Sequence, residues 1–345
     1  MIYFASFTAM LFLRLARVQG GYPVLLILLF LFSAFRYQVG CDWPGYENQY
    51  QVFGQNSLRD LLTLNEPLWT AIIMAQIKLG LPYPWLNVIS SAIFFWGVHR
   101  LAIRQPDKLG FLVLLFPILI LNMPMSGIRQ GAAIGLICLA FNAFSDRSLF
   151  RYLIFVLLGA SIHSSASIFL LIAPLVQGNL TRGRFLLCLV LAVPAGFGLM
   201  GSEMAATATT RYVGSGIDSA GAIYRTGLLV ATAVLFFLSL RRHWARLFAD
   251  DLKLVTIGSL MMLATGAVLI LSTVIGDRLG YYFIPIQTMI LARIPRLPLR
   301  RGRAFLSSAP YAVLLVLLLG WMTFSPLFAG CYLPYESWIP SLFAF

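Results

Sequence analysis

The amino-acid composition of this chain excludes a soluble globular protein. Hydrophobic residues make up 60% and charged residues only 11% of its 345 residues, which leaves too few polar side chains to cover a soluble domain. The formal net charge of +13 is concentrated in short connections between apolar stretches. It therefore predicts the sidedness of a membrane protein, and no nucleic-acid partner is expected.

Twelve apolar stretches predict membrane-spanning helices. They lack the alternation of a transmembrane β-barrel, so helices must satisfy the backbone hydrogen bonds. In chain order the stretches are 2–16, 22–36, 84–101, 109–123, 129–144, 150–163, 166–177, 185–200, 223–240, 254–273, 281–292 and 304–325. Several are shorter than the roughly 20 residues of a full crossing. The sequence thus predicts an all-α polytopic bundle of ten to twelve spans, forming a single membrane domain over residues 1–345.

Six clusters of basic residues lie between these stretches and predict which ends are cytoplasmic. Under the positive-inside rule all six face the cytoplasm, and both termini lie outside. The clusters are Arg14 and Arg17; Arg100, Arg104 and Lys108; Arg147 and Arg151; Arg182 and Arg184; Arg241, Arg242, Arg246 and Lys253; and Arg293, Arg296, Arg300, Arg301 and Arg303.

The segment from Glu66 to Gly80 is apolar enough for a helix, but as a crossing it would invert the sidedness of every later loop. We therefore interpret it as a re-entrant or interfacial helix near 66–80. Pro67 suits the first turn of that helix, and Gly80 suits its end. The external loops are then 37–83 and 201–222, and both are expected to lie over the functional site.

Four polar strings fall at the external ends of the predicted spans. They are Phe35 to Asp42, Ser126 to Gly131, Ile162 to Ser165, and Gly276 to Tyr282. A charged group at a membrane boundary that faces the bundle interior is a candidate functional residue, because burying it has a high energetic cost.

These strings, with their order and spacing, resemble a known family. Arg36 to Tyr46, then Asn65-Glu66-Pro67, then Gly127 to Gly131, then His163 to Ala166 are similar to the EpsG family of Wzy-like bacterial polysaccharide polymerases. The likeness runs from the first span to about residue 295.

The resemblance implies a membrane-embedded, GT-C-like glycosyltransferase at the outer face of the bacterial inner membrane, with its active site facing the periplasm or exterior. Such a protein joins oligosaccharide repeat units carried on polyprenyl pyrophosphate. The implied partners are the lipid-linked oligosaccharide, membrane lipid, and other polysaccharide assembly and export proteins. The chain has no His pair at helical spacing and no carboxylate cluster typical of a metal site, so we expect neither a metal nor a cofactor.

Three external arginines are candidates for binding the pyrophosphate: Arg36, Arg129 and Arg278. A guanidinium stays charged and grips phosphate oxygens through two parallel hydrogen bonds. Arg129 also begins a predicted helix, whose N-terminus favours an anion. The structural alternatives are that Arg129 pairs with Asp42 or Asp277, that Arg278 pairs with its neighbour Asp277, or that these arginines snorkel to the headgroups.

The catalytic base is expected to be either Asp42 or His163, and the sequence does not separate them. Asp42 is a carboxylate at the membrane surface that can accept the proton of an attacking sugar hydroxyl. His163 has a pKa suited to proton transfer near neutrality. A nucleophilic role for Ser164 beside His163 is disfavoured, because adjacent residues on a helix do not face each other.

Residues close to these candidates are expected to bind the sugar. Aromatic faces suit pyranose rings, although interfacial belts of Trp and Tyr are their ordinary alternative. The expected substrate-binding residues are Trp43, Tyr46, Glu47, Gln130, Ser164, Tyr281 and Tyr282.

The four cysteines form no metal motif. Cys138 and Cys188 fall inside spans as small apolar residues. Cys41 and Cys331 are both expected outside, where oxidation is permitted, so they either form a disulfide or remain separate thiols.

Other function classes are a transporter or flippase of lipid-linked oligosaccharide, a membrane acyltransferase and a non-catalytic scaffold. A transporter would show polar groups in mid-span and pseudo-symmetric halves, and neither is evident. An acyltransferase would need its His near a cytoplasmic donor or an acidic partner close in sequence.

Overall fold

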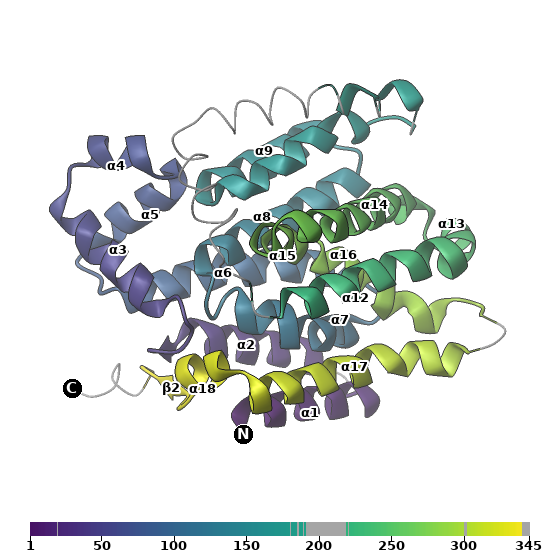
Figure 1. The fold of residues 1–345 in the computed structure, drawn as a ribbon, viewed down its shortest axis with the longest axis horizontal. Coiled ribbons are helices and arrows are strands. Elements are labelled where there is room, and N and C mark those ends of the chain that lie inside the picture. Colours follow the sequence, from purple (N-terminus) through teal and green to yellow (C-terminus); the bar gives the residue numbers. More distant parts are fainter. Residues whose placement is uncertain are drawn as a thin grey trace. The chain divides into compact units, whose positions relative to one another are not determined.

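The computed structural model describes residues 1–18, 20–179, 181–184, 186–188, 190, 219, 221–299 and 302–339 (Figure 1). Helices dominate these residues, and the only strands among them are the two-residue β1 (Arg36–Tyr37) and β2 (Glu336–Ser337), which pair antiparallel. The all-α class expected from the sequence is therefore confirmed. The predicted span 185–200 and the loop 201–222 lie largely outside the described residues.

The chain divides into two compact units. Unit 1 comprises Met1–Leu139, Leu157–Ala166 and Gly302–Phe345, and unit 2 comprises Ala140–Val156 and Ser167–Arg301.

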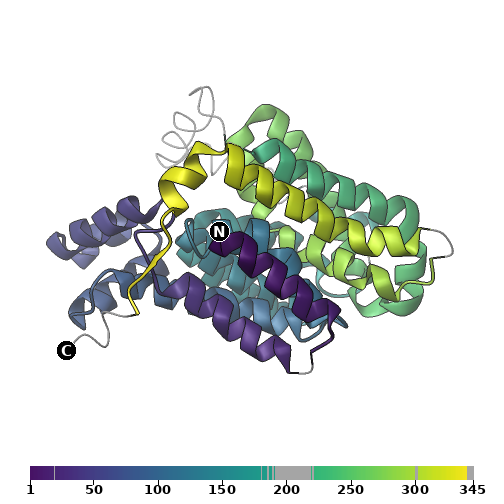
Figure 2. The same ribbon diagram turned by 90° about the horizontal axis from the view of Figure 1, so that it is seen from below.

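Unit 1 contains the apolar helices from both ends of the chain. They are α1 (Ile2–Leu15), α2 (Gly21–Ala34), α6 (Pro84–Ala102), α7 (Lys108–Leu115) with η1 (Phe116–Ile120), the first part of α8 (Ile128–Ser145), the end of α9 (Leu149–Ile162), α17 (Arg303–Phe324) and α18 (Pro326–Tyr332). Helix α1 (purple) packs against α7 and α17 (yellow), so the N-terminal helix lies beside a C-terminal one (Figure 2).

Two glycines let α8 approach α6 closely. Gly97 on α6 and Gly135 on α8 face each other so tightly that a Cβ on either would overlap the opposite backbone. Close approach of this kind is typical of small residues at membrane helix interfaces. It fixes the position of α8, whose first turn carries Arg129.

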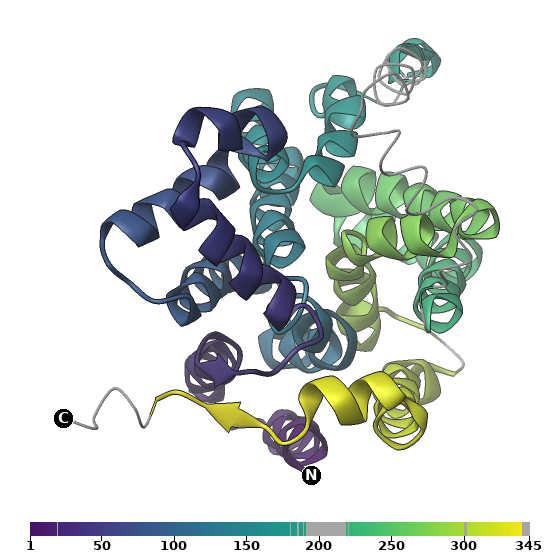
Figure 3. The ribbon, with the colours of Figure 1, turned by 60° about the vertical axis from the view of Figure 1, so that its left-hand side comes forward.

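Loop 37–83, which is predicted to be external, contains three short helices, α3 (Trp43–Gln55), α4 (Leu58–Leu64) and α5 (Pro67–Lys78), drawn in dark blue in Figure 3. Helix α5 occupies the segment expected to be interfacial or re-entrant, and its 12 residues are fewer than the roughly 20 of a crossing. Helices α3 and α4 were not expected. Local signals explain their starts: Pro44 stands in the first turn of α3, and the Ser57 side chain accepts a hydrogen bond from the backbone N–H of Asp60 in α4.

Unit 2 is built on long apolar helices. Its elements are most of η2 (Ser164–Leu175), α12 (Ala222–Leu235), η3 (Phe236–Leu240), α13 (Arg241–Leu247), α14 (Ala249–Leu271), α15 (Thr273–Tyr281), α16 (Ile284–Arg293) and η4 (Ile294–Arg296). Helix α12 packs along α14 and α15.

Four helices among the described residues are long and apolar enough to cross a membrane: Ile128–Ser145, Ala222–Leu247, Ala249–Leu271 and Arg303–Phe324. Shorter apolar helices accompany them at Ile2–Leu15, Gly21–Ala34, Lys108–Ile120, Leu149–Ile162 and Ser164–Leu175. The protein is thus a polytopic membrane protein, and the count of ten to twelve crossings stays a prediction.

Candidate functional site

Glu66 and Arg129 form an ion pair in unit 1, at the end predicted to be external. Glu66 is the residue before α5, and Arg129 is in the first turn of α8. Arg129 Nη1 donates to Glu66 Oε2 at 2.9 Å, and the side chains are 26% and 12% exposed. The pair is therefore partly shielded from water but reachable from one side. The sequence predicted Arg129 as a site residue, with Asp42 or Asp277 as its possible acidic partners; the partner in the structure is Glu66.

His163 joins this pair from the end of α9. Its Nδ1 lies 3.7 Å from Glu66 Oε1, and the imidazole is 11% exposed. The same Oε1 accepts the backbone N–H of Ser164 at 3.3 Å, whose side chain is exposed. Glu66 thus links the start of α8 to the turn after α9. It also supplies an acidic partner for His163, and the sequence close to His163 contains no such acid.

The surroundings of Glu66 keep it ionised. Burial alone would raise its pKa, but the nearby His163 imidazole, the positive charge of Arg129 and the hydrogen bond from the backbone N–H of Ser164 lower its pKa to about 2. A fixed negative charge therefore lies between a guanidinium and an imidazole at neutral pH.

Arg129 keeps hydrogen-bonding capacity beyond this ion pair. Its Nε is buried and has no hydrogen-bond partner within the described part of the chain. A buried donor without an acceptor has an energetic cost of about 1–3 kcal/mol. An anionic ligand that supplied an oxygen to Arg129 would remove this cost.

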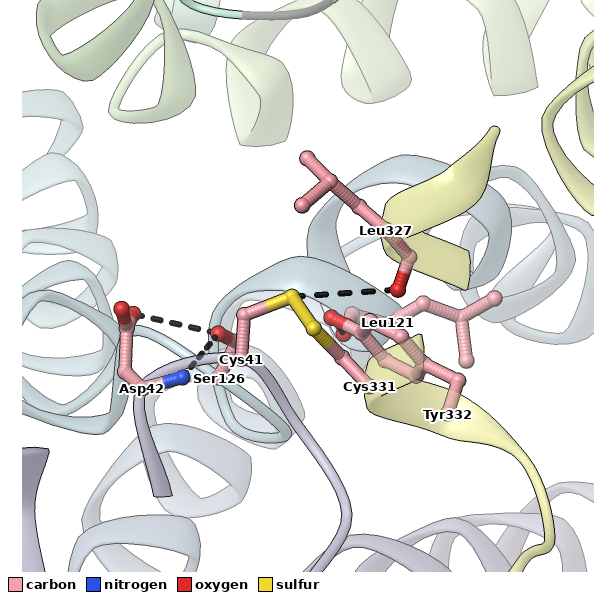
Figure 4. Close-up of a disulfide and its surroundings, with 7 residues drawn as sticks. All are labelled: Cys41, Asp42, Leu121, Ser126, Leu327, Cys331 and Tyr332. Atoms are coloured by element: carbon pink, nitrogen blue, oxygen red, sulfur yellow. Dashed lines mark hydrogen bonds between the residues drawn. A yellow bond between two sulfur atoms is a disulfide. The ribbon is translucent and has the colours of Figure 1, made fainter. Parts of the chain in front are cut away.

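Asp42 lies on the neighbouring loop of unit 1 and is exposed. The Ser126 hydroxyl donates to Asp42 Oδ2 at 3.1 Å and accepts from the Asp42 backbone N–H at 3.3 Å (Figure 4). Ser126 precedes Arg129 by three residues, so their Cα atoms are at most about 11 Å apart. The two candidate bases, Asp42 and His163, are therefore both attached to elements around the start of α8.

The loop that carries Asp42 is held by a C-terminal clasp, which consists of Cys331 in α18 and strand β2. Cys41 forms a disulfide with Cys331, which confirms the paired alternative of the sequence prediction (Figure 4). The backbone N–H of Gly40 donates to the Cys331 carbonyl at 2.7 Å, and β1 pairs with β2 on the other side of this loop. The residue beside Asp42 is thus attached covalently to α18.

Arg36 is fully buried and engaged by the protein itself. Its Nε donates to the carbonyls of Val39 and Met125, Nη1 to the Ser33 carbonyl and Nη2 to Asn87 Oδ1, all at 2.8–2.9 Å. This placement argues against direct contact with a pyrophosphate. Arg36 instead fixes the loop that carries Asp42 to α2, α6 and the segment before α8.

The predicted sugar-binding residues of unit 1 differ in accessibility. Trp43 is 3% exposed, packs edge-on against Tyr83 and has the Arg36 guanidinium over its ring, so it is a core residue without a free face. Gln130 is also buried. Tyr46 and Glu47 on α3 are half-buried, and Tyr46 packs against Trp69. Tyr46, Glu47 and Ser164 are therefore the accessible members of the set.

The predicted residues of unit 2 form a separate cluster around Asp277. Arg225 binds this carboxylate through two hydrogen bonds, Nε to Oδ1 at 2.7 Å and Nη2 to Oδ2 at 2.6 Å, and the Ser219 hydroxyl adds a third at 2.7 Å. Arg278, the sequence neighbour of Asp277, is exposed. The ion pair foreseen between Asp277 and Arg278 is thus made by Arg225.

The two aromatic candidates of unit 2 are buried. Tyr281 is 6% exposed and lies under the Arg225 guanidinium, while Tyr282 is fully buried against Phe169. Neither offers an open face for a sugar ring in this structure, so both contribute to the packing of α15.

Five residues of these clusters were not predicted as site residues from the sequence: Glu66, Ser126, Ser219, Arg225 and Asp277. For Glu66 a signal was present, because it is a charged residue in the Asn65-Glu66-Pro67 string at an external boundary. The string was interpreted as a helix start and as part of the family resemblance, without a site role for Glu66. Ser126 opens one of the four polar strings, whereas Arg225 had no signal beyond its external position.

Comparison with known proteins gives one match. The model of the EpsG family matches residues 22–337, which is nearly the whole chain and includes every residue of the two clusters. No curated protein and no solved structure matches the chain.

Proposed function

Because the chain belongs to the EpsG family, which implies a Wzy-like exopolysaccharide polymerase, we propose that it joins oligosaccharide repeat units carried on polyprenyl pyrophosphate. The proposed location is the bacterial inner membrane, with the reaction at its periplasmic or outer face. The proposed enzyme class is a glycosyltransferase that uses no metal or cofactor.

The observation that carries this proposal is the cluster of Glu66, Arg129 and His163. It combines an anion-binding guanidinium with a proton-transferring imidazole, and a carboxylate joins the two. These are the two functions that transfer from a sugar pyrophosphate requires: stabilising the leaving group and removing a proton from the attacking hydroxyl.

In the proposed reaction, a hydroxyl oxygen of the acceptor sugar attacks the anomeric carbon of the donor glycan. The bond from that carbon to the phosphate oxygen breaks, and its electron pair leaves with the polyprenyl pyrophosphate. Arg129 supplies Nε and its remaining N–H groups to the phosphate oxygens, whose negative charge grows as the bond breaks.

The hydroxyl proton passes to His163 or to Asp42. Glu66 favours His163, because a carboxylate facing Nδ1 orients the ring and stabilises the imidazolium that forms when Nε2 takes the proton. Asp42 remains the rival base, since it is exposed and lies on the adjoining loop.

Further residues are proposed to contact the substrate around this centre. Tyr46, Glu47 and Ser164 are accessible in unit 1 and would bind the sugars. Arg278 is exposed in unit 2 and is proposed to bind phosphate.

The test is a polymerisation assay with purified, reconstituted protein and a lipid-linked repeat unit. The wild type should convert this substrate into a ladder of longer glycans on a gel. Arg129→Ala should leave it unextended, Arg129→Lys should extend it slowly, and Arg59→Ala, which alters an exposed external arginine on α4, should match the wild type. Arg59→Ala should retain the wild-type unfolding temperature, and the Arg129 variants should still unfold cooperatively, although Arg129→Ala unfolds at a lower temperature because Glu66 loses its partner.

The same preparation separates a polymerase from a flippase. A flippase would move labelled lipid-linked sugar between leaflets without lengthening it. Translocation without a ladder would contradict the proposal, and so would a normal ladder from Arg129→Ala.

A further inference from the structure

Unit 2 contains a cationic cavity that the proposed reaction does not use. Its volume is about 210 Å³, and it is lined by residues at the end of α8, the start of α13, the start of α14 and the segment after η2. The charged side chains on its wall are Arg147, Arg241, Lys253 and Asp250. Three cations and one carboxylate give the wall a formal net charge of +2.

The two arginines of this cavity are not neutralised by any residue that the structure describes. Neither the Arg147 nor the Arg241 guanidinium forms a hydrogen bond or ion pair with a residue that the structure describes. Arg241 lies over the Phe237 ring, 6.0 Å from its centroid, and both arginines are exposed. Two like charges on one small cavity repel each other, and a bound anion would remove that repulsion.

Lys253 fixes the wall of the cavity. Its Nζ donates to the carbonyls of Val176 and Gly178, each at 2.9 Å, and lies 5.3 Å from the centroid of the Phe144 ring. These contacts attach the segment after η2 to α14 and to the end of α8. These contacts of Lys253 therefore hold the segments of the cavity wall together within unit 2.

The start of α14 adds to the positive potential. This 23-residue helix has no side-chain cap at its N-terminus, and its first residue, Ala249, lines the cavity. Of the two acids in the first turn, Asp251 is paired with Arg293 at 2.7 Å. Asp250 is thus the single carboxylate on the cavity wall, beside three cationic side chains. The positive end of the α14 helix dipole adds to the positive potential of these cations.

We propose that this cavity binds the phosphate of an anionic phospholipid headgroup in the cytoplasmic leaflet. The positive-inside pattern assigns Arg147, Arg241 and Lys253 to the cytoplasmic face, where anionic lipid is abundant. Basic pockets beside membrane helices on that face suit lipid headgroups. A phosphate diester with one negative charge fits a wall of charge +2 that retains one carboxylate.

The experiment measures lipid binding by native mass spectrometry of the full-length, delipidated protein in detergent. The probes are phosphatidylglycerol and phosphatidylcholine of the same chain length. The wild type should hold one phosphatidylglycerol in preference to phosphatidylcholine. The Arg147→Gln/Arg241→Gln variant should bind it roughly 30-fold more weakly, since each cation near an anionic surface contributes about fivefold.

Two variants serve as controls. Arg242→Gln/Arg246→Gln removes two exposed charges from the same helix without altering the cavity wall, and it should bind like the wild type. Arg147→Lys/Arg241→Lys keeps both charges and should retain most of the binding, which separates lost charge from lost folding. Tryptophan fluorescence during heating checks that each variant is folded.

The outcomes are distinct, and none requires a glycan substrate, so this test does not depend on the polymerase proposal. Equal binding by the wild type and Arg147→Gln/Arg241→Gln would overturn the inference. Displacement of phosphatidylglycerol by millimolar inorganic phosphate, with stabilisation by phosphate alone, would identify a free-phosphate site and overturn the lipid assignment. A preference that survives inorganic phosphate and is lost only in the cavity variant supports it.

Discussion

Glu66 and Arg129 are 63 residues apart in the sequence, and their side chains meet at 2.9 Å at the start of α8. The same carboxylate also accepts the backbone N–H of Ser164 and faces His163. One acid therefore connects the guanidinium proposed to bind pyrophosphate with the imidazole proposed to accept a proton. This arrangement makes Glu66 the residue whose substitution should affect both functions.

Glu66→Gln should reduce chain growth while leaving a folded protein. The amide keeps an acceptor for Ser164 but removes the charge that pairs with Arg129 and orients His163. We expect a loss of 10- to 100-fold in rate, since a positioned acid–base group contributes about 10²–10⁴-fold, and a loss of about 1–3 kcal/mol in stability. Ladder formation and thermal unfolding measure the two effects.

The matched control for this prediction is Glu336→Gln, because Glu336 is an exposed external acid of the same unit. It should leave both measurements unchanged. A Glu66→Gln enzyme with the wild-type rate would show that the carboxylate has no part in the reaction.

The ionisation of Glu66 predicts a pH dependence of stability. Its pKa in the folded protein is about 2, below the ordinary glutamate value of 4.5 that applies to the unfolded chain. A lowered carboxyl pKa stabilises the folded state above pH 4.5, and this contribution is lost as the pH falls toward 2. The contribution is on the order of 3 kcal/mol.

Unfolding temperatures measured from pH 5 to pH 2 should therefore fall more steeply for the wild type than for Glu66→Gln, which has no carboxyl to protonate. The two curves should converge at the acid end. Parallel curves over the whole range would mean that Glu66 titrates normally and is not held by Arg129 and His163.

The fold was predictable where composition alone constrains it. Segments such as 84–101 are too apolar for water, and a helix satisfies their backbone, so the prediction agrees with α6 within one residue at each end. Helix α3 was missed because its sequence is largely polar, and α4 because its seven residues are too few to show a helical period. Capping and packing against α5 stabilise them, and single-sequence periodicity does not show that packing.

The site was predictable only in part. Arg129 and His163 were predicted as site residues because burying an ionisable group at a membrane boundary is energetically costly and usually serves a function. Their connection through Glu66 was hidden, since it depends on three segments meeting in space. Arg36 was expected to bind phosphate on the same grounds, but its surroundings supply four acceptors, and no sequence pattern distinguishes a buried structural arginine from a ligand-binding one.

Arg36→Ala should prevent folding rather than weaken substrate binding. It removes the donors for three backbone carbonyls and the Asn87 side chain inside unit 1. Leaving buried polar groups unpaired has an energetic cost of about 1–3 kcal/mol each. Yield of monodisperse protein and unfolding temperature are the measurements, and both should fall sharply.

Arg36→Lys should rescue this defect only slightly, because an ammonium lacks the planar fork that reaches acceptors on several sides. Arg59→Ala is the exposed control and should behave as the wild type. A stable Arg36→Ala protein with weakened substrate binding would instead restore Arg36 to the phosphate site.

The disulfide between Cys41 and Cys331 should stabilise the loop that carries Asp42. It links residues 290 positions apart, and removal of such a bond typically destabilises a protein by about 2 to 5 kcal/mol. We expect Cys41→Ser/Cys331→Ser to melt at a lower temperature and to form glycan ladders more slowly, because Asp42 is adjacent to the bond. Dithiothreitol should lower the unfolding temperature of the wild type and leave that of the variant unchanged.

A maleimide-polyethylene glycol gel shift of denatured protein supplies the count of free thiols: the wild type should gain two labels before reduction, at Cys138 and Cys188, and four after it. Four labels on unreduced protein would show that Cys41 and Cys331 are separate thiols and that only hydrogen bonds and packing hold this loop.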